Sequence, residues 1–536
     1  MSLQLLGSKS KKKFLFANIS PSTSSFASLS LAYQWYISCR ACHKQCNRLV
    51  KRPRWMPTRL LDIGVEGDAN WKLHVQSQDG CISPNYVTLS YRWGSSPTPM
   101  LTQSTITEFR RGRPICDLPQ TFKDAIVVAR RFSIRYLWID SLCIVQDSQE
   151  DWEMESSMMR DVYANSSCNI AATASVDPQG GLFRPRRQVD VQPGVIKLST
   201  INSTEQPFLV YDKSYWDRHV SRSVLHRRGW VFQERLLAPR VLHFTKTQIF
   251  WECFRDQKCE GFPLGTFVDW PLKNFEALFE PRQRPLSLFA FSTWNDLVEA
   301  YSKCALTRPE DKLVALSGLA RLFQDMTGDE YLAGLWRSRL PESLGWRVYT
   351  PTTKLSSDYR APSWSWASVD GQVWPGGVGS VDTQLITVKE AQVTHSGFDS
   401  TGQVLDGFII VEGLLVQTTY HRTGKRGPTC QLTTADEEIS ANVWKDALDT
   451  RFEDGSEMHC LALNGTPDYS GDSRCGYRLI GLILEPVAGP SGDYARIGHF
   501  DIDKIDDIEK FGISVDKEDF LVAQINPDQL STVKII

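Results

Sequence analysis

The stretch LPQTFKDAIVVARRFSIRYLWID, residues 118–140, predicts a helix followed directly by a strand. Pro119 suits a first helical turn. Apolar side chains then recur at helical spacing, at Phe122, Ala125, Ile126, Ala129 and Phe132. The following YLWID, residues 136–140, is a compact apolar run that predicts a buried strand with Asp140 at its carboxyl end. An amphipathic helix next to a buried strand is typical of layered α/β structure.

The segments on both sides of this stretch repeat the same alternation. YVTLSY, residues 86–91, predicts a strand that ends at the loop RWGSSPTP. DWEMESSMMRDVYANSS, from residue 151, predicts a second helix, and CNIAATAS, from residue 168, predicts a third strand. The order strand, helix, strand, helix, strand predicts a mostly parallel sheet with flanking helices. Functional groups in such sheets lie at the carboxyl ends of the strands, so we expect residues 90–94, Asp140 and Ser141 at one rim.

A carboxylate lies on the apolar side of the next predicted helix. RGWVFQERLL, residues 228–237, follows an irregular stretch at 176–225 that reads as an insertion, and it precedes the strand segments RVLHFT and QIFWEC. Helical spacing places Trp230, Glu234 and Leu237 on one face. A charge at such a position is costly unless it is paired, hydrogen-bonded or used in chemistry. Glu234 is therefore a candidate functional residue, and we expect it to face a cleft rather than pack into the core.

The rest of the chain divides by composition. We expect a flexible leader at 1–34 and an N-terminal flanking segment at 35–85. The α/β domain with its insertion is expected at 86–255, a mostly helical extension at 256–370 and a β-rich C-terminal region at 371–536. The β-rich region is indicated by LITVKEAQV, FIIVEGLLVQTTY, RLIGLILEP and FLVAQI. In PSWSWAS, residues 362–368, we expect an extended backbone with Trp364 and Trp366 as packing anchors.

Bulk properties exclude several classes of protein. A chain of 536 residues is long enough for two or three domains. A formal charge of −2 gives no electrostatic reason for binding nucleic acid or an anionic membrane. The chain has no run of eighteen apolar residues, so we expect no membrane span. Thirteen cysteines, an odd number in a long chain, favour free thiols and a cytoplasmic location.

Sequence motifs for metal, thiol or phosphate chemistry are weak. Cys39, Cys42, His43 and Cys46 lie close together, but no second Cys/His pair follows at a finger-like distance, so we expect no metal site. Cys143 is interpreted as a small buried thiol rather than a nucleophile. The chain has no GxxxxGK[ST], no GxGxxG after a strand and no GxSxG, which argues against P-loop ATPases, kinases and typical hydrolases.

Three blocks of the sequence resemble the fungal heterokaryon-incompatibility (HET) domain and occur in the order of that family. They are YVTLSYRWG at 86–94, LPQTFKDAIVV…NIAATAS at 118–175 and RGWVFQERLLAPRVLHFTKTQIFWEC at 228–253. The segments PTRLLDI, YLAGLW and APSWSWAS resemble what commonly flanks that domain. The resemblance implies a role in a filamentous fungus, in which non-self recognition on cell fusion ends in programmed cell death.

The blocks in turn resemble the Toll/interleukin-1 receptor (TIR) domain, which implies a flavodoxin-like α/β fold. Trp230 and Glu234 fit the Trp-x-x-x-Glu pattern that carries the catalytic glutamate of NAD+-cleaving TIR members. Val231 replaces the usual cysteine after the tryptophan, and Arg235 replaces the usual leucine after the glutamate. About fifty residues are also inserted before the helix.

Two functions therefore stay open. In the first, the protein is an NAD+ glycohydrolase without a cofactor, and NAD+ is its substrate. Glu234 would then be catalytic, Arg92 could meet the pyrophosphate, and Trp93 or Trp230 could stack on a flat ring, with Asp140 and Ser141 completing the substrate site. In the second, the protein is a non-catalytic adaptor or scaffold that acts by self-association or by binding a recognition receptor. Glu234 would then be structural, for example paired with Arg228 or Arg92.

Overall fold

The chain folds into two compact units, which span Met1–Phe275 and Glu276–Ile536. The computed structural model describes residues 3–6, 19–47, 55–80, 85–192, 194–200, 203–265, 272–279, 286–352, 359–376, 383–397, 399–423, 429–435, 437–448, 450–468, 476–488, 492–516 and 523–536. The first unit extends about twenty residues beyond the predicted domain end at residue 255.

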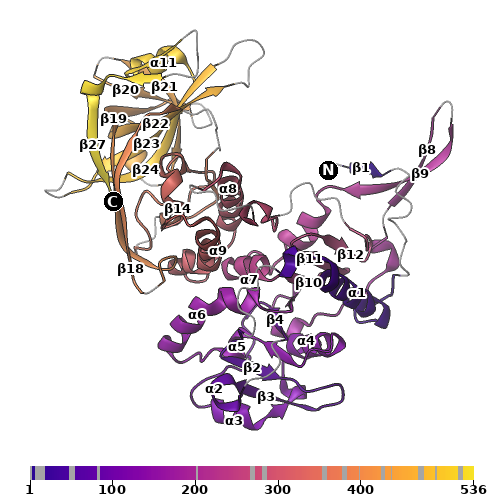
Figure 1. The fold of residues 1–536 in the computed structure, drawn as a ribbon. Helices are drawn as coiled ribbons and strands as arrows, with labels where there is room; N and C mark the ends of the chain where they lie inside the picture. The colour runs from indigo at the N-terminus through magenta and orange to yellow at the C-terminus, as the bar shows by residue number, and fades with distance from the viewer. Residues whose placement is uncertain are drawn as a thin grey trace. The chain divides into compact units, whose positions relative to one another are not determined.

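A nine-stranded mixed sheet forms the centre of the N-terminal unit (Figure 1). Its spatial order is β12 (Gln257–Cys259), β11 (Ile249–Cys253), β10 (Arg240–Phe244), β7 (Cys168–Ala171), β4 (Tyr86–Ser90), β6 (Tyr136–Trp138), β2 (Arg59–Asp62), β3 (Asn70–Val75) and β5 (Arg113–Pro114). The α/β prediction is confirmed in part. The four inner strands β10, β7, β4 and β6 are parallel, whereas the pairs on both sides of them are antiparallel.

Across the sheet, the four parallel strands stand in the order β6, β4, β7, β10. These are the second, first, third and fourth of them along the chain, so β4 lies between β6 and β7. The chain therefore crosses the sheet in one direction from β4 to β6 and in the other from β6 to β7. Since such connections are right-handed, the two crossover helices lie on opposite faces of the sheet. They are α4 (Gln120–Arg131) and α6 (Gln149–Ala164), and α6 packs against α7 (Gly229–Leu237).

Local sequence explains these helices. The apolar stripe predicted for α4 is buried, and the helix starts directly after Pro119. Ser148 caps α6 by accepting a hydrogen bond from the backbone N–H of Asp151 at 3.3 Å. The remaining helices of this unit are α1 (Phe26–Cys42), α2 (Gln76–Asp79), α3 (Ile106–Arg111) and α5 (Asp140–Cys143).

The prediction of a flexible leader over residues 1–34 is wrong for its second half. Ser25 caps helix α1, and Ala32, Trp35 and Tyr36 of that helix are buried. The ring of Tyr36 stacks on Phe132 at 5.0 Å between centroids. Serine and alanine between the larger apolar residues leave this helix without a clear amphipathic pattern, so the spacing of apolar residues did not predict it. The part of the leader at residues 7–18 lies outside the described residues.

One other predicted boundary changes as well, whereas the insertion stays separate from the main sheet. The flanking segment 35–85 supplies β2 and β3, so it belongs to the same sheet as the α/β domain. The insertion 176–225 contains a hairpin of β8 (Gly194–Thr200) and β9 (Ser203–Asp212), which pairs with β1 (Leu3–Leu6) in a separate three-stranded sheet. The insertion thus leaves the main sheet, as expected for an excursion.

The C-terminal unit begins with helices packed around tryptophans. Its first helices are α8 (Leu288–Ser302), α9 (Ser317–Thr327) and α10 (Leu340–Ser343), with the short strands β13 (Tyr331–Leu332), β14 (Leu335–Trp336), β15 (Arg347–Val348) and β16 (Val373–Trp374). Trp364 and Trp366 are fully buried, which confirms them as packing anchors. The predicted extended backbone is wrong there, because a 3-10 turn at Trp366–Ser368 follows directly and is capped by Ser365.

The predicted β-rich region forms a closed antiparallel barrel in Figure 1. The pairing runs from β19 (Val404–Arg422) through β22 (Ser456–Asp468), β23 (Gly476–Pro486), β24 (Tyr494–Ile502), β21 (Glu438–Lys445) and β20 (Thr429–Thr433) back to β19. Closure removes free edges, and the apolar interior supplies a core. The outer strands are β17 (Thr383–Gln384), β18 (Thr387–His395) and β27 (Leu530–Ile535), and α11 (Ile505–Lys510), β25 (Ile513–Val515) and β26 (Ala523–Ile525) complete the unit.

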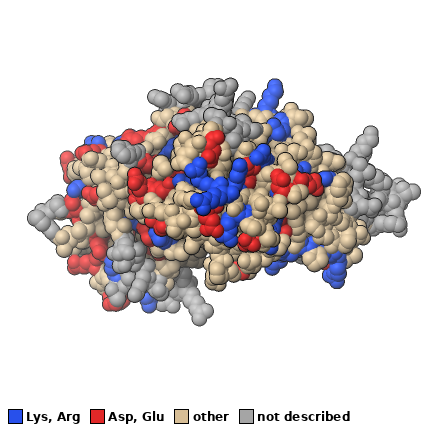
Figure 2. Space-filling view, turned by 90° about the horizontal axis from the view of Figure 1, so that it is seen from below, with Lys and Arg blue, Asp and Glu red and all other residues tan. Residues whose placement is uncertain are grey.

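Surface charge is mixed, in agreement with the small net charge. Figure 2 shows acidic and basic side chains interspersed on the face that it draws. Across the described part of the chain, none of the helices combines the length and the apolar character needed to cross a membrane.

Candidate functional site

The carboxyl ends of β4 and β6 bring the predicted rim residues together. The indole Nε1 of Trp93 donates a hydrogen bond to Asp140 Oδ2 at 2.7 Å, and the hydroxyl of Tyr91 donates to Ser141 Oγ at 2.9 Å. The two strands are parallel neighbours, so their following loops lie at the same edge. The predicted proximity of these two loops is confirmed.

Asp140 and Ser141 differ in their exposure. Ser141 is buried, whereas Asp140 and Trp93 are partly exposed. Asp140 Oδ1 also accepts the backbone N–H of Ser141 at 2.7 Å, so this carboxylate caps its own turn. Burial raises the pKa of Asp140, and the hydrogen bond from Trp93 and the charge of Arg228 lower it in part.

Glu234 lies at the carboxyl end of β4, next to the last residue of that strand. The hydroxyl of Ser90 donates a hydrogen bond to Glu234 Oε2 at 2.5 Å. Asn169 Nδ2, on the neighbouring strand β7, donates in turn to Ser90 Oγ at 2.9 Å. Thr88 Oγ1 donates to Asn169 Oδ1 at 3.0 Å. The carboxyl group thus ends a buried line of hydrogen bonds that crosses two parallel strands.

Burial dominates the acidity of Glu234. It raises the pKa of this carboxyl group to about 7, from 4.5 for an ordinary glutamate. The hydrogen bond from Ser90 lowers the pKa, the negative charge of Asp140 raises it, and Arg228 and the hydroxyl of Tyr163 lower it. Glu234 therefore exchanges a proton near neutral pH, which is the range useful for acid, base or electrostatic catalysis.

The expectation that Glu234 faces a cleft is wrong, and the arginines considered as its structural partners do not pair with it. Only 7% of the residue is exposed, so it packs into the core between α7 and β4 rather than beside an open cleft. Its partner is also a hydroxyl and not an arginine. Arg228 Nη1 donates to the backbone oxygen of Tyr91 at 2.6 Å, and Arg92 has no ion pair or hydrogen bond among the residues that the structure describes. Burial of the helix on both sides favours neutral hydrogen-bond partners over a second charge.

Trp230, on the same helix, reaches the surface. It is half-buried, and its ring meets Trp152 of α6 edge-on at 6.3 Å between centroids. The helical face predicted from Trp230, Glu234 and Leu237 therefore runs from the protein surface into the core.

Sequence reasoning missed several polar side chains of this site. Asn169 and Tyr163 are both buried, and they act on Glu234 through Ser90 or directly. Asn169 carried a signal that could have found it, because it is a polar residue inside the apolar strand segment CNIA. Such a residue must find partners within the fold.

A second buried polar network lies on α7 beside Arg235. Its guanidinium forms a two-pronged ion pair with Glu252, at 2.7 and 2.8 Å. His243 Nε2 lies 3.2 Å from Glu252 Oε2, and His226 Nε2 lies 3.1 Å from His243 Nδ1. Burial lowers the pKa of His243 to about 4, so this imidazole is neutral at pH 7. The arginine that departs from the TIR pattern is thus held by a structural ion pair.

Thiols of the N-terminal unit differ in their surroundings. Cys143 is buried, and burial raises the pKa of its thiol to about 12, in agreement with a structural role. Cys39, His43 and Cys46, by contrast, are joined by Cys253 in one buried cluster, whereas Cys42 is exposed. The missing fourth residue comes from a strand more than two hundred positions away, which counts against the expectation of no metal.

Comparison with known proteins supports one assignment. Residues 86–234 match the family model described as Heterokaryon incompatibility protein (HET), from the first residue of β4 to Glu234. No curated protein and no solved structure gave a significant match. The match spans the parallel strands β4, β6 and β7 with their crossover helices, and it ends at the carboxylate that contacts Ser90. Residues 86–234 of this chain are therefore a heterokaryon-incompatibility (HET) domain.

Proposed function

We propose that this protein signals cell death in heterokaryon incompatibility of a filamentous fungus, and that its HET domain does so by cleaving NAD+ at Glu234. The HET match supports the biological role. The observation that carries the chemistry is the buried hydrogen bond between Glu234 and Ser90, at the end of a parallel strand. We place the protein in the cytoplasm, where it would associate with further copies of itself and with a recognition receptor.

The strand order supports a TIR-like, flavodoxin-like interpretation of the sheet. In flavodoxin-like folds the parallel strands follow the order second, first, third, fourth, fifth, and ligands bind where the direction of travel reverses. The order β6, β4, β7, β10 corresponds to the first four of these strands. The reversal lies between β4 and β7, which are the strands that carry Ser90 and Asn169. Glu234 therefore lies at the edge where that fold places its ligand, and binding of NAD+ there requires that the side chains covering its carboxyl group move aside.

The proposed reaction breaks the bond between the ribose C1′ and the nicotinamide nitrogen. Nicotinamide leaves with the bonding electron pair as a neutral molecule, so its departure needs little acid assistance. The ribose carbon gains positive charge, and a nearby carboxylate stabilises it. Water then adds to C1′ and loses a proton, giving ADP-ribose. Glu234 must be ionised for this role, so activity rises with pH through about 7.

The rim supplies groups for the rest of the dinucleotide. Arg92 is a half-buried cation on the loop after β4, and it fits a pyrophosphate contact. Trp93 and Trp230 are partly exposed rings that could stack on the nicotinamide or the adenine. Asp140 and the hydroxyl of Ser141 lie at the same rim and could hold the ribose hydroxyls.

A non-catalytic adaptor is the second candidate function. It is favoured by the burial of Glu234 and by the satisfied hydrogen bond from Ser90, because both features also suit a purely structural carboxyl group. In that case the HET domain would act by self-association or by binding a receptor.

One experiment separates the two functions. Purified full-length protein, concentrated enough to assemble, is incubated with NAD+ at pH 8, and nicotinamide is measured by chromatography. Catalysis predicts release by the wild type and by Glu66→Gln, which changes an exposed glutamate, and loss of release in Glu234→Gln. Toxicity in cells that is retained without nicotinamide release would establish the adaptor function instead. Release that persists in Glu234→Gln would exclude Glu234 as the catalytic group.

A further inference from the structure

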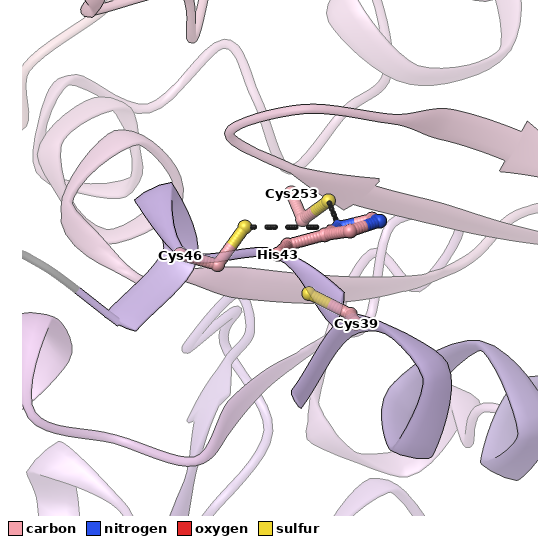
Figure 3. Close-up of side chains that lie close together, drawn as sticks. All are labelled: Cys39, His43, Cys46 and Cys253. Atoms are coloured by element: carbon pink, nitrogen blue, oxygen red, sulfur yellow. Dashed lines mark hydrogen bonds between the residues drawn. The ribbon is translucent and has the colours of Figure 1, made fainter. Parts of the chain in front are cut away.

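Four side chains from distant parts of the N-terminal unit meet in one buried cluster (Figure 3). Cys39 lies in the last turn of α1, His43 caps that helix, and Cys46 lies in the 3-10 turn Gln45–Asn47. Cys253 is the last residue of strand β11. All four residues are at least nine-tenths buried.

Helical spacing explains which cysteines take part. Cys39 and His43 are four positions apart and therefore lie on the same face of α1, toward β11. Cys42 is three positions from Cys39, but its side chain is exposed and does not join the cluster. The cluster thus uses the spacing Cys-x-x-x-His-x-x-Cys, with Cys253 as a distant fourth member, and not the Cys39/Cys42 pair.

The distances fit a tetrahedral metal ion. His43 Nδ1 lies 3.5 Å from Cys253 Sγ and 4.0 Å from Cys46 Sγ, and the four donor atoms all lie within 4.8 Å of one another. Zinc binds sulfur at about 2.3 Å and nitrogen at about 2.0–2.1 Å. Tetrahedral geometry then separates the ligand atoms by about 3.6–3.8 Å. A small contraction around one ion would complete the site.

The surroundings supply the outer contacts of a zinc site. His43 Nε2, the nitrogen facing away from the sulfurs, lies 3.4 Å from Asp256 Oδ2. A carboxylate in this position fixes the ring orientation and makes the other nitrogen a better ligand. The backbone N–H of Asp256 donates to Cys253 Sγ at 3.3 Å, and Arg240 Nε donates to Cys39 Sγ at 3.2 Å. Hydrogen-bond donors directed at sulfur favour thiolates, and buried thiolates need a cation between them.

We propose that Cys39, His43, Cys46 and Cys253 bind one structural Zn²⁺. Three cysteines and one histidine form a closed set of four ligands, so no position is left for a substrate. Three thiolates with Zn²⁺ carry a net charge of −1, and the adjacent Arg240 guanidinium offsets it. Zinc is favoured over magnesium or calcium because those ions prefer oxygen ligands.

The proposed ion joins parts of the chain outside the HET match. Helix α1 precedes residues 86–234, and β11 follows them, so the site fixes helix α1 to the antiparallel edge of the HET sheet. The stable unit would therefore need both flanking segments. The inference does not depend on NAD+ cleavage, because the cluster lacks Glu234 and the rim residues.

Metal analysis of the full-length protein tests the site. Untagged protein is purified without chelators and measured by elemental mass spectrometry, and we expect on the order of one zinc ion per chain. The variant Cys253→Ala should lose this zinc, whereas Cys42→Ala, which changes an exposed cysteine of the same helix, should retain it. Zinc retained in Cys253→Ala, or less than about a tenth of an ion in the wild type, would overturn the proposal.

A second measurement covers the case in which Cys253→Ala does not fold. Wild-type protein is treated with a chelator under reducing conditions, and thermal unfolding is followed before and after zinc is restored. We expect removal to lower Tm by about 5 °C or more and restoration to reverse the change. Co²⁺ added instead should give the intense visible absorption of a tetrahedral thiolate site. An unchanged Tm together with no Co²⁺ band would refute the site.

Discussion

The substitution Glu234→Gln makes the stability of the N-terminal unit less dependent on pH. Glutamine keeps the size of the side chain and an oxygen that accepts the hydrogen bond from Ser90, but it cannot ionise. The wild-type carboxyl group has a folded-state pKa of about 7 and an ordinary value of 4.5. Since the folded protein holds this proton more tightly than the unfolded chain does, folding and protonation are linked.

The sign and the size of the effect follow from these two values. Below pH 4.5 the group is protonated in both states, and its contribution to stability is fully present. Between pH 4.5 and about 7 the unfolded chain loses the proton first, so the wild-type protein loses stability as pH rises. At about 1.4 kcal/mol per pH unit the loss reaches about 3 kcal/mol, and it is complete above pH 7.

Thermal unfolding of wild type, Glu234→Gln and Glu66→Gln between pH 4.5 and 8.5 measures this effect. As pH rises over this range, the free energy of unfolding of the wild type should fall by about 3 kcal/mol relative to that of Glu234→Gln. This corresponds to roughly 6–12 °C in Tm for a unit of this size. The control Glu66→Gln alters an exposed residue and should follow the wild type.

A difference between wild type and Glu234→Gln that stays constant over this pH range would refute the reasoning. It would mean that Glu234 does not carry the raised pKa. A second variant checks the cause. The hydrogen bond from Ser90 lowers the pKa of Glu234, so Ser90→Ala should raise that pKa and extend the loss of stability to higher pH. An unchanged profile in Ser90→Ala would show that this hydrogen bond does not control the carboxyl group.

Two further substitutions test packing in the two units. Arg235→Leu restores the residue of the TIR pattern and removes the ion-pair partner of the fully buried Glu252, so it should destabilise the N-terminal unit by about 3–5 kcal/mol in thermal unfolding. A neutral or stabilising result would show that the ion pair is dispensable. Gly481→Ala places a methyl group 2.3 Å from the ring of Phe500 inside the barrel and should destabilise the C-terminal unit by about 1–3 kcal/mol in denaturant unfolding. In the control Gly397→Ala the added methyl group meets nothing within 4 Å, so the free energy of unfolding should change little. Equal effects of the two substitutions would contradict the described packing.

The sequence by itself determined the local elements of the HET domain and their order. The apolar spacing of residues 118–132 and the run at 136–140 correspond to α4 and β6, and YVTLSY corresponds to β4. Parallel pairing of β4 with β6 then follows from the helix between them, which is why the proximity of Trp93 and Asp140 was predictable. Periodicity is a short-range signal, and it suffices where the partner is the next strand along the chain.

Contacts between distant segments were decided only by the tertiary structure. Glu234 meets Ser90 across 144 positions, and Cys253 meets His43 across 210. Helix α1 has no clear amphipathic pattern, and its buried face, which includes Ser28, became apparent only in the packed structure. Which polar or sulfur-bearing side chains share a site depends on strand order and on the packing of helices between them. Neither is encoded in the spacing of neighbouring residues, because pairing partners are chosen by the burial of whole faces.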